Sequence, residues 1–380
     1  MIKNGIDRIE QYDSLFRGKR LGLITSVTGL TAGFESTINV LHQRYHLTAM
    51  FSPEHGVRGN VPAGGLVDTY TDSVTGVKVY SLYRGDSHRM TQEMLDAVDM
   101  VVYDIQDVGT RYYTYLYTML YALEDCAKAG KEFVILDRAN PLGDRVEGNV
   151  LKPEFKSFVG NFPLAMRYGL TIGEFAQMAD DVLGLHAELS VVPVEGWQRD
   201  MLYPETGRCW IPPSMGLPGF DAALMYPGLC LFEGTNLSEG RGTTRPFLEI
   251  GAPFVDAQEL ADAMQGKGLK GVAFTTAYFT PTTSKYEGEA CQGVNLYVTD
   301  MREVSPVEVG MTLLYEIMDR YGEEARFLPP VKEGGRQFIE LLCGSDILTR
   351  QKKSLPELLE EFGEESRAFA EQKKQYHLYE

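Results

Sequence analysis

The sequence predicts an α/β protein in which a doubly wound parallel sheet is followed by a second, α+β domain. Short apolar segments alternate with helical segments through the first half of the chain, and this alternation is typical of a parallel sheet covered by helices. With 380 residues, the chain is longer than one ordinary domain, and its hydrophobic content of 44% is enough for two cores. We therefore expect a first domain at residues 1–205 and a second at residues 206–380 that closes a cleft against it.

Six apolar segments are expected to form the strands of the first domain: 20–25, 47–51, 78–82, 99–105, 131–136 and 189–194. Helices are expected at 1–20, 36–45, 91–97, 111–128 and 171–183. Ser36 and Thr91 are placed to cap the helices that follow them, and Gly130 is placed to end the helix before it. Thr171 and Glu174 match a capping box. This Rossmann-like order places the carboxyl ends of the strands along one edge of the sheet.

The second domain is expected to combine helices at 257–264 and 306–321 with strands at 271–276 and 293–299. Residues 206–250 show few periodic signals and contain many prolines and glycines. Residues 354–380 are charged and follow a helical pattern with apolar residues on one face. We expect this tail to cover the body of the protein rather than to take part in chemistry.

Polar loops that contain glycine follow four of the first five strands, at 25–29, 52–59, 106–111 and 137–143. In doubly wound sheets, ligands bind outside the carboxyl ends of the strands, so a site is expected there. The acidic side chains expected on this rim are Glu54, Asp104, Asp107 and Asp137. Glu233 and Glu239 are expected to reach the rim from the second domain, because glycine-rich loops such as 231–246 are usually functional.

Glu54 is the first candidate for a catalytic carboxyl. In the segment LTAMFSPEHGVRG, an apolar strand breaks at a Ser-Pro pair and presents Glu54, His55 and Arg58 between glycines. A turn in which Glu54 and His55 only hydrogen-bond the local backbone is the alternative. Glycoside hydrolysis requires an acid and a second group, and we expect Asp107 or Glu239 to serve as base or electrostatic stabiliser.

The composition and the glycine motifs argue against several classes of protein. The net charge of −17 argues against nucleic-acid binding, and the absence of an 18-residue apolar run argues against membrane insertion. GLITSVTG and GTNLSEGRG match neither the GxxxxGK(S/T) nor the GxGxxG pattern, so no cofactor is expected, and no ligand spacing indicates a metal. Scattered cysteines and the absence of a signal peptide favour a cytoplasmic protein, with export and removal of a leader as the alternative.

Six segments resemble a known family: GKRLGLITSVTG, FSPEHGVRG, VYDIQDVGTRYYTY, VILDRANPLGDRVEG, YPGLCLFEGTNLSEGRGTTRPF and FAEQKKQYHLYE. The chain resembles, over essentially its whole length, the bacterial exo-β-N-acetylmuramidases, the NamZ-like peptidoglycan hexosaminidases. The resemblance implies release of N-acetylmuramic acid from the non-reducing end of peptidoglycan fragments, in a cleft between a Rossmann-like domain and a second one. It places the family's catalytic glutamate, in SPEHG, at Glu54. Many members carry NQTG where this chain has SVTG at 26–29, so this chain departs from the family pattern at the position of the amide side chains.

The implied substrate, a MurNAc-GlcNAc saccharide, gives the polar residues more specific expected roles. Glu54 would be the general acid, and the acetamido group of the substrate could replace a second carboxyl as nucleophile. Arginine grips a carboxylate at two points, so one of three arginines is expected on the lactyl group: Arg58, Arg111 or Arg241. His55 and Asn236 are further substrate-binding candidates. Tyr112 and Tyr113 could stack on sugars, although their spacing favours the core. A sugar-binding protein without turnover and a nucleotide-dependent transferase are the rival functions.

Overall fold

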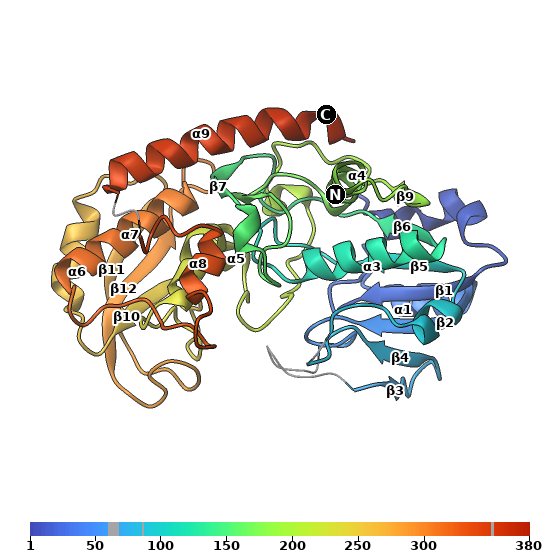
Figure 1. Cartoon of the computed structure of the whole chain (residues 1–380), viewed down its shortest axis with the longest axis horizontal. Coiled ribbons are helices and arrows are strands. Elements are labelled where there is room, and N and C mark those ends of the chain that lie inside the picture. The colour runs from blue at the N-terminus through green and yellow to red at the C-terminus, as the bar shows by residue number, and fades with distance from the viewer. Residues whose placement is uncertain (60–67, 86, 351–352) are drawn as a thin grey trace.

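A seven-stranded sheet forms the first lobe of the protein (Figure 1). The computed structural model describes residues 1–59, 68–85, 87–350 and 353–380. The strand order is β3-β4-β2-β1-β5-β6-β9, and all neighbours are parallel except β3 and β4. The strands are β1 (Arg20–Thr25), β2 (His46–Ser52), β3 (Tyr70–Thr71), β4 (Lys78–Ser81), β5 (Met100–Asp104), β6 (Glu132–Leu136) and β9 (Leu189–Val192). The order reverses between β1 and β5, as the predicted doubly wound sheet requires.

Helices cover both faces of this sheet because its strands are apolar on both faces. Alternate residues of β5 and β6 enter two different cores, Val101 and Phe133 on one face and Val102 and Val134 on the other. The helices of this lobe are α1 (Thr37–Arg44), α2 (Gln92–Asp96), α3 (Tyr115–Ala129) and α4 (Ile172–Leu183). Their predicted caps are confirmed: Ser36 and Thr91 accept backbone N–H groups, Gly130 is left-handed, and the capping box that Thr171 begins is formed.

Two of the expected helices differ from the structure. The segment 1–20 forms a 3-10 helix, Gly5–Leu15, which is kinked at Tyr12. The helix expected from 111 begins only at Tyr115, since the chain before it pairs with another strand. Thr110 bridges Arg167, and the Arg111 N–H donates to the Met166 carbonyl at 2.9 Å. A tertiary partner therefore holds these residues out of the helix.

The second lobe is built on a three-stranded antiparallel sheet in the order β10-β12-β11. The sheet comprises β10 (Glu249–Ala252), β11 (Val272–Phe279) and β12 (Cys291–Val298), and it packs with α6 (Ala257–Gln265) and α7 (Pro306–Arg320). The predicted strands and helices of this region match these elements to within a few residues. The other elements here are the hairpin β7 (Glu147–Val150) and β8 (Ala165–Arg167), α5 (Phe220–Leu229) and α8 (Phe338–Cys343).

Helix α5 had no sequence prediction because Pro227 and Gly228 interrupt its pattern. The structure explains the glycine by a close approach between α5 and α7. A Cβ built on Gly228 would lie 1.8 Å from the carbonyl oxygen of Pro306, and one on Gly310 would lie 2.4 Å from the Gly228 oxygen. The two helices therefore pack backbone against backbone, which only glycine allows.

The tail of the chain runs across both lobes. Helix α9 (Leu355–Lys373) packs on β7 and contacts α7, and Figure 1 shows it in red spanning the top of the molecule. Beyond it, the Glu380 carbonyl accepts the Arg199 N–H at 3.0 Å, and the Tyr379 hydroxyl donates to Asp137. As expected, the tail covers the body of the protein, and its last residues fasten to the first lobe.

Candidate functional site

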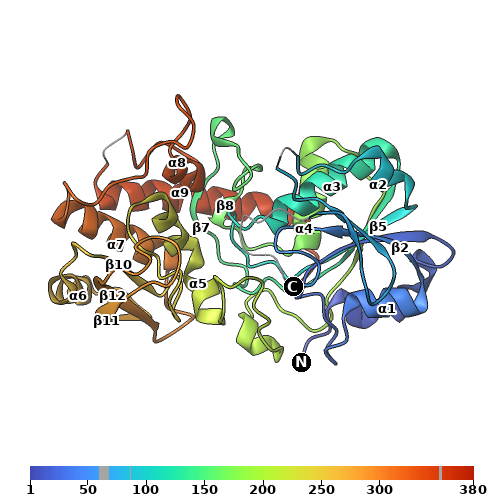
Figure 2. The ribbon, with the colours of Figure 1, turned by 90° about the horizontal axis from the view of Figure 1, so that it is seen from below.

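A cavity of about 240 Å³ lies where the loops of the first lobe meet α5 and the loop after it. Figure 2 shows α5 at the junction of the two lobes. The polar and aromatic residues in its wall are Glu54, His55, Tyr112, Tyr113, Thr114, Ser214, Tyr226, Cys230, Glu233, Arg241 and Phe247. Polar groups that converge in an otherwise aromatic cavity are the usual composition of a small-molecule site.

A tight turn at the end of β2 brings Glu54 into this wall. The Ser52 carbonyl still accepts the Leu82 N–H at 2.8 Å, and the chain then turns through a Gly56 N–H to Pro53 carbonyl bond of 3.1 Å. His55 has a φ of +70°, a left-handed conformation that costs a non-glycine residue about 1–3 kcal/mol. Strain of this kind is concentrated at functional sites, and here it lies next to Glu54.

The start of α3 fixes the Glu54 carboxyl. The Thr114 hydroxyl donates to Glu54 Oε2 at 2.7 Å, and the Tyr115 hydroxyl donates to the Glu54 backbone oxygen at 3.3 Å. The His55 ring meets the Tyr115 ring edge-on, with 6.2 Å between ring centroids. Tyr115 is buried and Thr114 is half-buried, and their contacts give Glu54 a defined orientation in the cavity wall.

An ion pair from the second lobe forms another part of the wall. Arg241 contacts Oε1 of Glu233 through Nε at 2.8 Å and through Nη2 at 2.6 Å. The guanidinium lies over the Phe247 ring at 4.9 Å, which adds a cation–π contact. The Cys230 thiol donates to the other oxygen of Glu233 at 3.4 Å. The cavity is thus bordered by a carboxylate and a guanidinium in fixed geometry.

Aromatic rings fill the space around these polar groups. The Tyr226 ring packs edge-on against Phe247, Tyr112 and Tyr113, with centroid distances of 4.8, 6.2 and 6.3 Å. Tyr112 and Tyr113 are both buried, as their spacing indicated, and both also line the cavity. Tyr226 was missed because the proline and glycine after it hide its helix.

Glu239 and Asp107, the two expected partners of Glu54, are not among the residues that line this cavity. Glu239 is buried against Lys285 Nζ at 2.9 Å and lies 3.4 Å from Arg241 Nε. Asp107 accepts the Gly109 N–H at 2.6 Å and the Tyr168 hydroxyl, and burial raises its pKa to about 6. Both carboxyls hold loops that support the site.

Three other sequence candidates also lie away from the cavity wall. Arg58 forms a bidentate pair with Asp72 at 2.7 and 2.9 Å. Asn236 is bonded to the backbone of Glu324 and Arg326 at 2.9 and 2.8 Å. Arg111 is fully buried, and its guanidinium donates to four carbonyl oxygens, those of Asn149, Leu164, Leu342 and Cys343. The structure therefore brings Glu54, His55 and Arg241 together in the cavity wall. The other five candidates do not line the cavity, although Glu239 contacts Arg241 from behind the wall.

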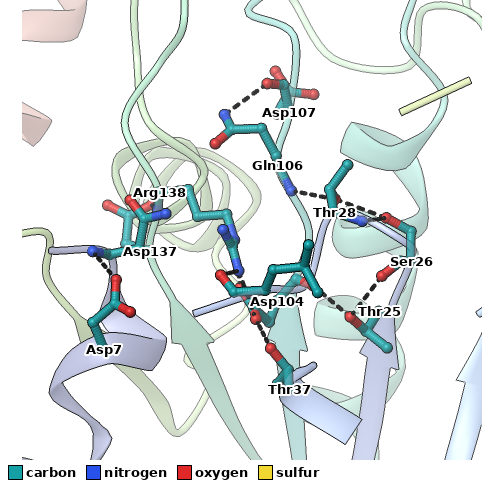
Figure 3. Close-up of polar contacts among 12 residues, drawn as sticks. Asp7, Thr25, Ser26, Thr28, Thr37, Asp104, Gln106, Asp107, Asp137 and Arg138 are labelled. Atoms are coloured by element: carbon teal, nitrogen blue, oxygen red, sulfur yellow. Dashed lines mark hydrogen bonds and ion pairs between the residues drawn. The ribbon is translucent and has the colours of Figure 1, made fainter. Parts of the chain in front are cut away.

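The remaining rim carboxyls hold the sheet together (Figure 3). Asp104 accepts Nε and Nη2 of Arg138 at 2.6 and 2.9 Å, and it also accepts the Thr37 hydroxyl. Asp137 accepts Thr171 Oγ1 at 2.7 Å, and the ion pair of Arg138 is made with Asp104 rather than with its chain neighbour Asp137. Arg138 and Gln106 line a small cavity of about 70 Å³ near the point where the strand order reverses.

Within the described ranges, no group of three or more His, Cys, Asp or Glu side chains is placed to hold a metal ion. The same part of the chain contains no helix with the length and apolarity needed to cross a bilayer.

Both parts of the chain match models of the same protein family. Residues 21–221 match the family model described as exo-beta-N-acetylmuramidase NamZ, N-terminal, and residues 224–379 match its C-terminal counterpart. The peptidoglycan beta-N-acetylmuramidase NamZ of Bacillus subtilis (strain 168) is 45% identical over 331 residues, which are 86% of this chain and 80% of that protein.

Two crystal structures of DUF1343 family proteins from Bacteroides fragilis NCTC 9343 share the fold. One has a TM-score of 0.92 and 38% identity, and the other has a TM-score of 0.78 and 30% identity. Each alignment covers 100% of this chain and 99% of the other. The chain therefore belongs to the family of the exo-β-N-acetylmuramidase NamZ.

Proposed function

We propose that the protein is an exo-acting glycosidase that releases N-acetylmuramic acid from the non-reducing end of peptidoglycan fragments. The observation that carries the proposal is the Glu54 carboxyl in a polar and aromatic cavity that also presents the Glu233–Arg241 pair. The name of the Bacillus subtilis relative supports the choice of substrate. A cavity of about 240 Å³ fits one terminal sugar better than a chain threaded through it, in keeping with exo action.

Glu54 is the general acid in this proposal. It gives its proton to the glycosidic oxygen as the bond to C1 breaks, and the Thr114 hydroxyl holds the carboxyl in position for this transfer. A general acid of this kind contributes about 10²–10⁴-fold to the rate.

Glu233 is the second carboxyl, in place of Asp107 and Glu239. It borders the cavity, whereas Asp107 is bonded to Gly109 and Tyr168, and Glu239 is bonded to Lys285. Its ion pair with Arg241 presents a negative charge to the oxocarbenium-like transition state. If the acetamido group of the substrate is the nucleophile, Glu233 stabilises the charge that develops on that group.

Arg241 is the arginine proposed to bind the lactyl carboxylate. Of the three candidates it is the one that lines the cavity, while Arg58 and Arg111 are engaged by Asp72 and by four carbonyl groups. Its Nη1 lies beside Gly216, where a Cβ would be 2.7 Å away, so glycine leaves room for a ligand oxygen. Nε and Nη2 meanwhile keep the guanidinium fixed on Glu233.

We also propose a cytoplasmic location, where the protein would act on fragments during cell-wall recycling. The five cysteines of the chain are all free, as expected in a reducing compartment. Fractionation of cells that make the full-length protein tests this: it should appear with cytoplasmic markers, and recovery outside the cytoplasmic membrane would contradict the proposal.

The function is tested by incubating the protein with a MurNAc-GlcNAc disaccharide and with longer chains that end in MurNAc. We expect equal amounts of free MurNAc and of the shortened saccharide, with no internal cleavage. Calorimetric heat of binding without released sugar would establish the rival sugar-binding function instead. A shift of the melting temperature with ADP or NAD would favour the transferase.

A further inference from the structure

We propose that an aromatic cluster beside the cavity, formed by Tyr83, His88 and Phe158, binds the leaving-group sugar, the residue that follows N-acetylmuramic acid across the bond to be cleaved. This inference rests on the proposed function and assigns a second subsite to the same site. The cluster is separate from the residues that line the cavity.

The position of the cluster follows from Val159 and Glu54. Val159 lines the cavity, and Phe158 is its neighbour in the chain. Burial raises the pKa of Tyr83, and the negative charge of Glu54 raises it further, so Tyr83 lies within electrostatic range of the proposed acid. The charge of Glu54 acts on His88 as well. Tyr83 and His88 contact the Phe158 ring, so the three rings lie beside the part of the cavity wall that Val159 forms.

A general acid must contact the oxygen that joins the two sugars. When the terminal sugar occupies the cavity with its lactyl group on Arg241, the glycosidic oxygen lies at Glu54. The next sugar then projects out of the cavity past Glu54. In the proposed complex, this second sugar contacts the aromatic cluster next to Val159.

The rings form a stacked surface that suits the apolar C–H face of a sugar. His88 and Phe158 stack with 3.8 Å between centroids and 13° between planes, and Tyr83 lies 5.1 and 5.8 Å from them. Burial lowers the pKa of His88, so its imidazole is neutral at pH 7 and behaves as an apolar ring. All three residues are only half-buried, unlike the core aromatics. Partly exposed aromatic surface of this kind contributes binding area at little entropic cost.

Three separate segments are brought together to build this surface. Phe158 lies in a tight turn between β7 and β8, where Ser157 and Gly160 exchange backbone bonds of 2.7 and 3.2 Å. Tyr83 and His88 follow β4, and Tyr121 of α3 supports Phe158 from 6.3 Å. The convergence fixes Phe158 in a turn whose side chain would otherwise face solvent.

The test is Phe158→Ala assayed with two substrates that differ only in the leaving group. One is the MurNAc-GlcNAc disaccharide, and the other is methyl β-N-acetylmuramide, whose methyl group is too small to reach the rings. We expect kcat/KM for the disaccharide to fall about 10-fold, the size of one aromatic contact, and kcat/KM for the methyl glycoside to stay unchanged. Phe158→Trp, which keeps an aromatic ring at this position, should retain the activity on the disaccharide.

Phe34→Ala is the matched control. Phe34 is also a phenylalanine with exposed surface, but it lines the small cavity of about 70 Å³ rather than the cavity that contains Glu54. It should leave both activities unchanged. Equal losses with both substrates for Phe158→Ala, or no loss with either, would overturn the inference. If the wild-type protein released MurNAc from neither substrate, the proposed function itself would fail, and that result is distinguishable from the first two.

Discussion

At the scale of single residues, the site depends on how the neighbours of Glu54 and Arg241 restrict them. The left-handed His55 and the Thr114 hydroxyl set the direction of the Glu54 carboxyl. Glu233 and the Phe247 ring do the same for the guanidinium of Arg241. The proposed proton donor, Glu54, and the proposed carboxylate-binding group, Arg241, therefore need little reorganisation when the substrate binds.

Arg241→Ala should raise KM for MurNAc glycosides by about 10- to 100-fold, since a charged hydrogen bond contributes about 1.5–3 kcal/mol. The matching GlcNAc glycosides lack the lactyl carboxylate, so their weaker hydrolysis should change far less. Steady-state kinetics with both substrates measure this difference. Arg58→Ala serves as the control, because Arg58 is paired with Asp72 away from the cavity wall. An equal effect of Arg241→Ala on both substrates would show that Arg241 does not recognise the lactyl group.

Asp104→Asn should destabilise the fold by about 3–5 kcal/mol, because it leaves the buried Arg138 guanidinium without its carboxylate. Urea unfolding measures the loss. The folded fraction should retain its catalytic activity, since Asp104 holds the sheet rather than the substrate. Normal stability combined with a large loss of kcat would assign Asp104 to the chemistry instead.

At the scale of the elements, the close packing of α5 on α7 carries Tyr226 and the loop that bears Glu233. The approach of Gly228 to Gly310 sets the distance between the two helices. The helix pair therefore supports the part of the cavity wall that contains Tyr226 and Glu233. The loop after it is anchored by Lys285, whose ammonium group contacts Glu239 and the carbonyls of Phe232 and Leu237. This anchoring restrains a loop that is rich in glycine.

Gly228→Ala should destabilise the protein by about 1–3 kcal/mol through overpacking against the Pro306 carbonyl. It should also lower activity, because it displaces the wall that carries Glu233. Thermal unfolding and the disaccharide assay measure the two effects. Gly219→Ala, in the same segment but with no atom within 4 Å of the added Cβ, should cost far less. Similar losses for the two variants would refute the packing argument.

At the scale of the whole molecule, the end of the chain joins the two lobes. Helix α9 leaves the second lobe, and Tyr379 then donates to the buried Asp137 at the carboxyl end of β6. Burial raises the pKa of Asp137 to about 6, and its hydrogen bond from Tyr379 opposes that rise. A carboxyl with a higher pKa in the folded state stabilises the fold at low pH and loses that contribution as the pH rises past about 6.

Tyr379→Phe should therefore cost more stability at pH 8 than at pH 5. Above pH 6 the Asp137 carboxylate is charged and buried, and the loss of a hydrogen bond to a charged group costs about 1.5–3 kcal/mol. At pH 5 the carboxyl is largely protonated, so a smaller loss is expected. Urea unfolding at the two pH values measures the difference, with Tyr376→Phe, on the exposed Asp181, as the control. A loss that does not depend on pH would contradict the assigned role.

The sequence allowed much of the fold to be predicted, because apolar periodicity and caps are local signals. The strands β1, β2, β4, β5, β6 and β9 fall where their apolar runs lie. Glu54 could be proposed as a catalytic residue for the same reason, since an apolar strand followed by proline and glycine indicates a polar loop at the strand end. The pattern could not show that Asp104 faces Arg138 or that Glu239 faces Lys285, because those pairs join residues distant in the chain. The sequence did not predict Tyr226 as a site residue, because Pro227 and Gly228 interrupt the helical pattern of α5. Only the contact with α7 explains why glycine is needed at 228.

The central claim is that Glu54 gives its proton to the departing sugar, and Glu54→Gln tests it most directly. Glutamine keeps the size of the side chain and can still bond to Thr114, but its amide has no acidic proton to give to the leaving oxygen. We predict that release of MurNAc from the disaccharide falls at least 100-fold with an unchanged melting temperature, while Glu195→Gln, on the exposed surface, stays at the wild-type rate. Turnover of Glu54→Gln near the wild-type rate would contradict the account.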